Sequence, residues 1–184
     1  MVIIVITFAV LFGNAISCAR VRVYSQEKAA TCTVPYADKY AIQFPGNLNF
    51  TSNGNIIKFH GNFSVTELIQ EPLEMILVSN RCTLDMKTCE QFNKVTLADI
   101  CRYINDEKGR WAPFFRSTDP DFKCPIKPGV YKFQKSILDL TFFTKFPMEG
   151  YRWLTFIKLF SGTKPKKELL CLTSQSSMYW IRKS

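Results

Sequence analysis

Cysteine offers the most chemistry in this chain of 184 residues, which holds seven cysteines. Cysteines can bind a metal ion, act as nucleophiles or form disulfides, and their spacing helps to separate these roles. No two of them are arranged as C-x-x-C, and the sole histidine completes no Cys/His metal pattern. We therefore expect disulfides, no metal and no cofactor. The cysteines are Cys18, Cys32, Cys82, Cys89, Cys101, Cys124 and Cys171.

Catalytic chemistry finds little support among the other residues. The only histidine, His60, falls on the polar face of an alternating segment, so a Ser-His-Asp or Cys-His arrangement would have to pass through an unsuitable site. The chain has no nucleophile elbow, zinc-protease motif or phosphate-binding loop. Of three neighbouring carboxylates, Glu67 and Glu71 are expected to be solvated near a turn, and Glu74 is expected to face away from Met75 in a strand. We expect a protein that is not an enzyme.

Residues 1–19 predict a secretory signal peptide. They carry no charged residue and begin with the apolar run VIIVITFAVLF, which is too short for the roughly 20 residues of a membrane-spanning helix. Two cleavage frames fit the small-residue rule, and only the frame Ser17-Cys18-Ala19 removes Cys18. That frame leaves six cysteines, an even number that indicates three disulfides in an oxidising compartment. Counting alone leaves open which of the fifteen possible pairings forms.

Residues 20–184 are expected to form one secreted domain, because no repeat, low-complexity tract or long linker divides them. Aromatic residues make up 14% of the chain, so there is much apolar material to enclose. The net charge of +9 favours attraction to acidic membranes, acidic glycans or anionic lipids, with solubility alone as the alternative. No nucleic-acid partner is expected, since the basic run KPKK at 164–167 is short.

Strand signals dominate the domain and predict a mainly β fold. Residues 56–65, IIKFHGNFSV, alternate between apolar and polar side chains, whereas residues 73–79, LEMILVS, are apolar on nearly both faces, as in a central strand. Two N-glycosylation sequons, at Asn49 and Asn62, agree with a secreted surface. Further strands are expected at 130–137, 151–160 and 168–173. Several short strands separated by turns describe a sandwich or a cup.

One helix is expected within TLADICRYIN, residues 96–105. Its apolar side chains have helical spacing, and Thr96 and Asp99 suggest a capping box at its start. The apolar face includes Cys101, so the helix should be stapled to the sheet.

The carboxy-terminal half resembles a known family. CPIKPGVYKFQKSILDL at 124–140, FPMEGYRWLTFIKLFSG at 146–162 and KELLCL at 167–172 are similar to the ganglioside GM2 activator and its insect relatives, within the MD-2-related lipid-recognition group. The shared elements are a Cys-Pro-x-Lys-x-Gly-x-Tyr segment, a Gly-Tyr-Arg strand start and a final cysteine in a closing strand. A weaker similarity extends back over NRCTLDMKTCEQF at 80–92.

This resemblance implies a fold and a disulfide pattern. The family fold is an antiparallel, immunoglobulin-like β-sandwich whose sheets splay into a cup for acyl chains. Carried over residue by residue, the pairs would be Cys32 with Cys171, Cys82 with Cys89, and Cys101 with Cys124. The activator carries an additional cysteine pair near the position of Cys124. This chain lacks that pair, which fits the simpler pattern of the insect relatives.

The cup would need apolar walls and an apolar rim, and both can be assigned to residues. Rim loops that dip into a membrane would carry Trp111, Phe114, Phe115, Phe142, Phe143 and Phe146. For the walls the alternative is an ordinary filled core, and for the rim it is a set of plugs under long loops. Alternation assigns the walls to Ile57, Phe59, Phe63, Leu73, Met75, Leu77, Tyr131, Phe133, Trp153, Thr155 and Ile157.

The resulting expectation is a secreted, non-catalytic lipid-binding or lipid-transfer protein of the sphingolipid-activator type. It would shield an apolar or glycolipid ligand and present it to a membrane, a hydrolase or a receptor, outside the cell or in a lysosome-like compartment. Two alternatives stay open: a chemosensory carrier of pheromones or cuticular hydrocarbons, and a secreted interaction factor without bound lipid.

Overall fold

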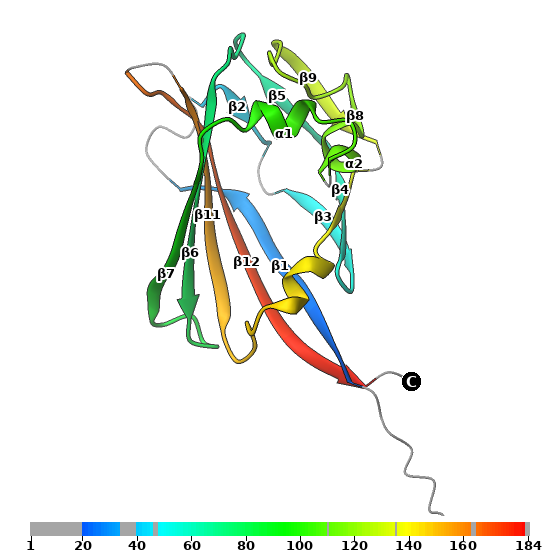
Figure 1. Ribbon diagram of the computed structural model, residues 1–184, viewed down its shortest axis with the longest axis vertical. Coiled ribbons are helices and arrows are strands. Elements are labelled where there is room, and N and C mark those ends of the chain that lie inside the picture. Colours follow the sequence, from blue (N-terminus) through cyan, green and yellow to red (C-terminus); the bar gives the residue numbers. More distant parts are fainter. Residues whose placement is uncertain are drawn as a thin grey trace, which may run out of the picture.

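The structure is a computed structural model that describes residues 20–33, 40–45, 48–109, 111–134, 136–162 and 165–182. The expected signal peptide, residues 1–19, lies outside the described residues. The described chain is mainly β, with antiparallel sheets arranged in two layers (Figure 1). This confirms the expected fold class.

The first layer is a five-stranded antiparallel sheet in the order β1-β12-β11-β6-β7. The expected strands at 73–79, 151–160 and 168–173 are all present in it, and two of them extend well beyond the expected ends. The longest is β12, which pairs with β1 on one side and with β11 on the other. The strands are β1 (Arg20–Thr31), β6 (Leu73–Cys82), β7 (Cys89–Leu97), β11 (Arg152–Ser161) and β12 (Glu168–Arg182).

The second layer consists of two smaller sheets, with the orders β10-β4-β3 and β2-β5-β9-β8. The two sheets share a polypeptide connection at Gly61, whose φ of 90° lies in the left-handed region that glycine favours. Their strands are β2 (Ile42–Gln43), β3 (Asn49–Asn53), β4 (Ile56–His60), β5 (Asn62–Val65), β8 (Thr118–Asp119), β9 (Gly129–Phe133) and β10 (Ile137–Asp139).

The expected strands at 56–65 and 130–137 were each wrong as single strands. The first breaks at Gly61 between β4 and β5, and the second breaks between β9 and β10. The two breaks are neighbours in space. The Phe133 amide donates to the Gly61 carbonyl, and the Phe59 amide donates to the Ser136 carbonyl. The second layer is therefore creased, while the alternation of apolar side chains continues across the crease.

The described residues contain three short helical segments in place of the single expected helix: α1 (Cys101–Asn105), α2 (Ala112–Phe115) and the 3-10 turn η2 (Thr141–Lys145). The expected start of the helix was wrong, because Thr96 and Leu97 belong to β7, where Leu97 pairs with Met75. The N-cap of α1 is Ile100, which makes no side-chain capping bond. The expected apolar face is correct for Ile100, Cys101 and Ile104, all of which are buried.

All three expected disulfides are present. They join Cys32 in the segment after β1 to Cys171 in β12, Cys82 to Cys89 across the β6–β7 hairpin, and Cys101 in α1 to Cys124. Because such bonds persist in oxidising compartments, the three disulfides fit an extracellular or luminal protein better than a cytosolic one. The helices of the described residues are all too short or too polar to span a bilayer.

Candidate ligand-binding site

The inner face of the five-stranded sheet is the side that carries Leu73, Leu159 and Met178. Leu73 and Leu159 pack into the main buried cluster together with residues of the β2-β5-β9-β8 sheet and α1. At the other end of the sheet, Met178 packs with Ile57 of β4 and forms a second, smaller cluster. These two clusters are called the upper and lower clusters below, and the inner face lies between them.

Cross-strand pairing orders the side chains of the inner face into rows, because directly paired residues project to the same side. From the upper cluster downwards, the first two rows are apolar, the third is polar and the fourth contains Trp153. The rows are Met75–Leu159–Leu170, Leu77–Ile157–Leu172, Ser79–Thr155–Ser174 and Arg81–Trp153–Ser176.

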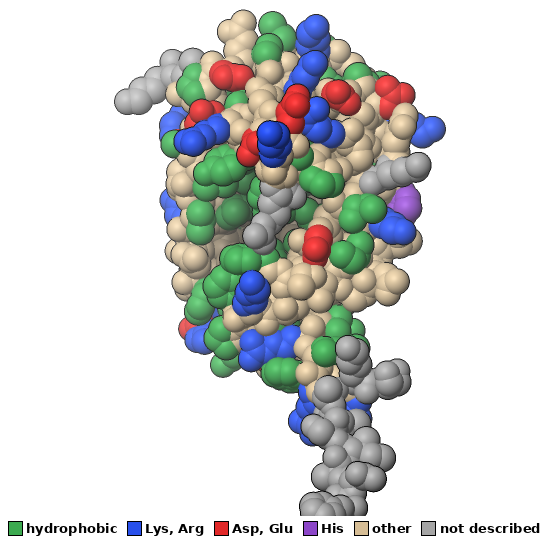
Figure 2. All heavy atoms as spheres, turned by 45° about the vertical axis from the view of Figure 1, so that its right-hand side comes forward, with side chains coloured by type: hydrophobic (Ala, Val, Ile, Leu, Met, Phe, Trp, Pro, Cys, Tyr) green, Lys and Arg blue, Asp and Glu red, His purple; other side chains and the backbone are tan. Residues whose placement is uncertain are grey.

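Burial along this face is uneven. Leu73 is 0% exposed and Leu159 is 7% exposed, as expected for a closed core. The second and third rows are only half-buried, although their strands β6 and β11 are central in the sheet. Inward-facing side chains of central strands are the most deeply covered part of a closed sandwich. Figure 2 shows hydrophobic side chains gathered around a hollow on one face of the molecule. The two clusters thus cover the ends of the inner face, and the side chains between them are less covered.

The opposite wall is aromatic. Phe59 of β4 and Phe133 of β9 have ring centroids 5.8 Å apart, and Phe114 of α2 lies 5.3 Å from Phe59. Phe133 also contacts Phe63, which stacks on Tyr131 at 5.3 Å. Aromatic pairs at these distances hold one another in place. The second layer therefore presents a continuous aromatic surface towards the inner face of the first.

The expected wall residues separate into two groups. Phe59, Met75, Leu77, Phe133, Thr155 and Ile157 are half-buried, with Met75 and Phe133 packed against the upper cluster and Phe59 against the lower one. The other expected wall residues are buried and close the ends: Ile57, Phe63, Leu73, Tyr131 and Trp153. The sequence pattern could not separate the two groups, because both alternate in the same way.

The expected rim residues separate likewise. Trp111 is 37% exposed, and Phe142 and Phe146 of the η2 region are 42% and 44% exposed. Phe114 and Phe115 are half-buried against the aromatic wall and each other, with centroids 5.2 Å apart. The expected rim thus contains outward-facing and wall-forming rings.

The η2 turn links the interior to the surface. Phe143 is half-buried and packs against the lower cluster, 5.5 Å from the ring of Tyr24. Phe142 contacts Phe143 at 6.0 Å and Phe146 at 5.1 Å. A row of rings therefore leads from the lower cluster out to solvent.

A polar row on the inner face was not predicted as a site, although Thr155 was named as a wall residue. It consists of Gln26, Ser79, Thr155 and Ser174, from four neighbouring strands. The hydroxyls of Ser79 and Thr155 are 3.2 Å apart, and the Gln26 amide donates to the Ser174 hydroxyl at 2.9 Å. Its members are far apart in the sequence, so only the strand register could have identified the row.

Tyr24 pairs with Met178, two rows below Ser174, and is buried. Burial raises the pKa of Tyr24 above its usual value of 10.0, against the opposite effect of hydrogen bonds to Ser176 and Ser174. Burial similarly raises the pKa of Tyr131 in the upper cluster, whose hydroxyl donates to the Lys127 carbonyl. Both phenols stay neutral at physiological pH.

Comparisons with known proteins identify no relative of this chain. No family model matches the chain, and a search of curated proteins finds no match. Membership of the activator family therefore stays a prediction.

The residues considered for catalysis do not assemble into a reactive site. His60 is exposed and its ring lies 3.0 Å from the Thr51 hydroxyl. Glu67 accepts from Lys167 at 2.5 Å, and Glu74 accepts from Lys166 at 2.6 Å. Each of the two carboxylates is thus held by a lysine near the β11–β12 turn.

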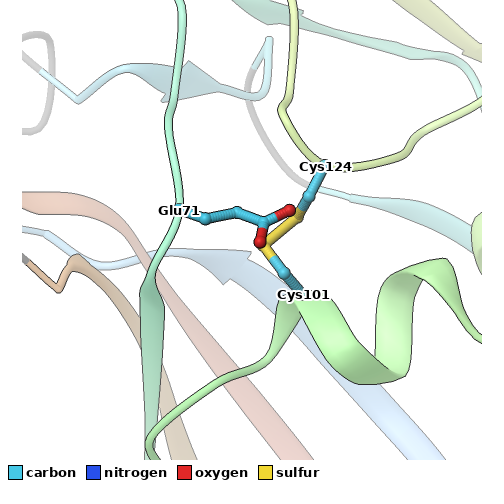
Figure 3. Close-up of side chains that lie close together, drawn as sticks. All are labelled: Glu71, Cys101 and Cys124. Carbon is cyan, nitrogen blue, oxygen red and sulfur yellow. A yellow bond between two sulfur atoms is a disulfide. The ribbon is translucent and has the colours of Figure 1, made fainter.

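Glu71 lies close to Cys101 and Cys124, and its carboxylate points towards their sulfur atoms (Figure 3). The three potential ligand atoms lie within 4.8 Å of one another. The two sulfurs are bonded to each other, so neither is a thiolate that could bind a metal. This arrangement is a disulfide beside an exposed carboxylate, and it holds α1 against the segment before β9.

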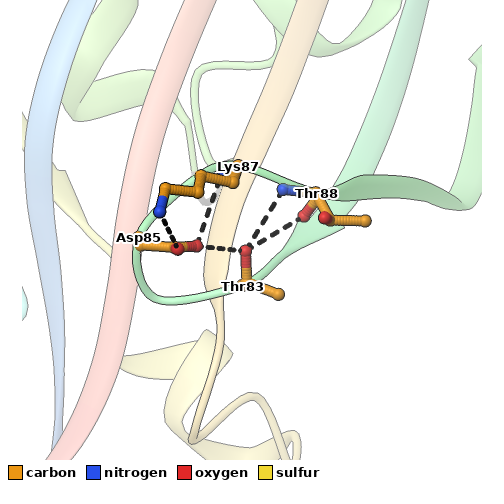
Figure 4. Close-up of polar contacts among 4 residues, drawn as sticks. All are labelled: Thr83, Asp85, Lys87 and Thr88. Carbon is orange, nitrogen blue, oxygen red and sulfur yellow. Dashed lines mark hydrogen bonds and ion pairs between the residues drawn. The ribbon is translucent and has the colours of Figure 1, made fainter.

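The β6–β7 hairpin ends in a hydrogen-bonded turn (Figure 4). The Thr83 hydroxyl donates to Asp85 at 2.6 Å, and the Lys87 amide donates to the same carboxylate at 3.2 Å. These bonds lower the pKa of Asp85, with the Thr83 hydroxyl as the largest cause. Together with the Cys82–Cys89 disulfide they make a stiff tip, away from the inner face.

The sequon residues Asn49 and Asn62 are both exposed on strands of the second layer. A glycan on either would need such a position, and glycosylation at these sites stays a prediction.

Proposed function

We propose that this protein is a secreted, non-catalytic carrier that binds the hydrocarbon part of a lipid between its two layers. One observation carries the proposal: inward-facing apolar side chains of central strands, including Leu77 and Ile157, are only half-buried. Leaving such surface open to water is unfavourable, at about 25 cal/mol per Å². A bound alkyl chain would cover it, with each buried methylene contributing about 0.8 kcal/mol.

Secretion is supported by the three disulfides and by the sequence pattern of residues 1–19. The cysteine pairing and the two-layer fold agree with what the resemblance to the ganglioside GM2 activator group implies. We therefore propose membership of that group and the same general role, which is to present a lipid or glycolipid to a membrane, a hydrolase or a receptor.

Delivery to a membrane would use the exposed end of the molecule at η2 and the adjoining ends of β1 and β12. Phe142, Phe146 and Trp180 are exposed there, and Arg22 lies over the Trp180 ring at 4.8 Å. Arg22 also donates to the Thr144 carbonyl at 3.2 Å, which ties η2 to β1. Exposed aromatic rings suit the interface of a bilayer, and the charge of Arg22 is itself balanced by an ion pair with Glu149. We call Phe142, Phe146 and Trp180 the aromatic lip.

The direct test is native mass spectrometry of the protein purified from a secreting eukaryotic cell under gentle conditions. The expected result is a species heavier than the glycosylated polypeptide by the mass of a lipid. Protein stripped of lipid should then take up a fluorescent single-chain lipid. A protein that is purified empty and does not bind this probe would contradict the proposal.

A matched pair of variants places the bound lipid. Leu77 faces the interior, whereas its neighbour Val78 faces the other side of the same strand, and both are half-buried. Leu77→Ser should weaken probe binding several-fold, while Val78→Ser should leave it nearly unchanged. Equal effects of the two substitutions would argue against binding between the layers.

A further inference from the structure

The inner face carries a polar row below two apolar rows, and this order has a consequence for the ligand. Hydroxyl groups are unfavourable in an interior that binds only hydrocarbon, because buried polar groups need hydrogen-bond partners. Gln26, Ser79, Thr155 and Ser174 are all half-buried rather than exposed on the outer surface. Ser79, Thr155 and Ser174 are directly paired across β6, β11 and β12. Gln26 of β1 pairs with Ser176 one row below, and its side-chain amide reaches up to the Ser174 hydroxyl.

The hydrogen bonds within the polar row leave capacity for a ligand. Ser79 and Thr155 have two hydroxyl protons between them, and their mutual bond uses only one. The other proton has no partner among the described residues. By contrast, Gln26 and Ser174 satisfy each other, since the amide donates to the hydroxyl at 2.9 Å and the hydroxyl donates back at 3.2 Å. The free donor capacity therefore lies on the Ser79–Thr155 pair.

A second unpaired hydroxyl lies nearby on the same face. Thr31 of β1 pairs with Leu172, which belongs to the second apolar row, one row above Ser174. Its Oγ1 is buried and has no hydrogen-bond partner among the described residues. An unpaired buried hydroxyl is unfavourable by about 1–3 kcal/mol.

The polar row is also uncharged. The charged side chain on this face next to the row is that of Arg81, which is already paired with Glu90 and lies 4.7 Å from the Tyr151 ring centroid. Tyr24, below the row, is buried and neutral. A carboxylate or phosphate placed at the row would be desolvated without a free cation among the described residues of this face, which is strongly unfavourable.

From these contacts we infer that the site is selective for a lipid with an uncharged oxygen group, such as an alcohol, an ester or an amide. The alkyl chain lies on the rows of Leu77 and Met75, and the oxygen accepts a hydrogen bond from the Ser79–Thr155 pair. This inference rests on the proposed function, because it specifies the ligand of the same site. It predicts that plain hydrocarbons and fatty-acid anions bind less well.

The experiment compares three competitors of equal chain length against a fluorescent single-chain probe: a straight-chain alcohol, the corresponding alkane and the corresponding carboxylate. The wild-type protein should bind the alcohol more tightly than the alkane by about 2- to 10-fold, the effect of one hydrogen bond. The carboxylate should bind weakly at neutral pH and improve as the pH falls and the carboxyl group becomes protonated.

The double substitution Ser79→Ala with Thr155→Val removes both hydroxyls with little change of shape. It should abolish the preference for the alcohol and leave alkane binding unchanged. Thr173→Val is the matched control, because Thr173 lies on the opposite face of β12, where its hydroxyl donates to the Ala30 carbonyl. This control should keep the full preference.

The outcomes separate this inference from the proposed function. Equal binding of alcohol and alkane by the wild-type protein would overturn the inference and leave the carrier function intact. Failure of all three competitors and of the probe to bind would overturn both. A double variant that folds and keeps the preference would show that the polar row is not the contact. Should that variant not fold, the comparison on wild-type protein still decides.

Discussion

The upper cluster and the middle of the inner face are built from the same strands but differ in coverage. Leu73 and Leu77 lie four residues apart on one face of β6, yet Leu73 is 0% exposed and Leu77 is half-buried. The difference arises from the second layer, since α1 and the β2-β5-β9-β8 sheet cover Leu73. The same residue type thus stabilises the fold at one position and is available for binding at the other.

The largest expected effect comes from truncating these two leucines. Leu73→Ala leaves a cavity in a closed core and should lower the free energy of unfolding by about 4 kcal/mol, near the upper end for such changes. Leu77→Ala removes a side chain that is already half-accessible and should lower it by about 1–2 kcal/mol. Chemical denaturation of lipid-free protein measures both, and equal losses would mean that the middle is as closed as the upper end.

The disulfides provide a second test of the closed end. Replacing Cys101 and Cys124 by serine opens a loop of 23 residues beside the upper cluster and should lower the free energy of unfolding by about 3 kcal/mol. The Cys82–Cys89 pair closes a loop of only 7 residues at a hairpin tip, and its loss should lower it by about 2 kcal/mol. Denaturation under non-reducing conditions measures both. A smaller loss for the first pair would contradict its role as a clamp.

Substitutions in the aromatic lip should slow lipid delivery without a large loss of folding stability. Phe142→Ser with Phe146→Ser changes exposed rings, so the free energy of unfolding should change by no more than about 1 kcal/mol, while transfer of lipid to anionic vesicles slows several-fold. Phe114→Ser changes a half-buried wall ring and should lower the free energy of unfolding by about 2 kcal/mol. Thermal unfolding and a vesicle transfer assay measure the two quantities.

The salt dependence of the same assay tests the contribution of charge. Transfer to anionic vesicles should fall as salt rises above roughly 0.15 M, where charges are screened beyond about 8 Å, and transfer to neutral vesicles should not. A lip variant that transfers lipid at the wild-type rate, with no salt dependence, would remove membrane docking from the proposed function.

The smallest expected effect is a loss of stability at alkaline pH. Both clusters contain a buried tyrosine that would have to lose its proton there. Because folding raises the pKa of Tyr24 above 10.0, the folded state holds its proton more strongly than the unfolded state. The contribution of Tyr24 to the free energy of unfolding should therefore not change below pH 10. Above pH 10 the free energy of unfolding should fall as the pH rises. Tyr24→Phe should reduce that fall, whereas Tyr179→Phe, at an exposed position, should not. Denaturation at several alkaline pH values measures the slopes.

Much of the fold could be predicted from local patterns. Alternation identified β4 and β5 and the side that each buries, because side chains of a strand project to opposite faces in turn, and a short apolar run identified β6 as a central strand. The resemblance to a known family supplied the cysteine pairing, which the counting of cysteines could not. The helix start at Thr96 was wrong because pairing of β7 with β6 continues through Leu97 and overrides a local capping signal.

The site depended on information that no local pattern holds. The sequence by itself determined which side chains face inwards, since this depends only on a period of two along each strand. Only the tertiary structure decided which of them are covered, because coverage depends on where the second layer creases at Gly61 and how far it extends. It also brought Ser79 and Thr155 together, since strand register joins residues that are 76 positions apart in the chain.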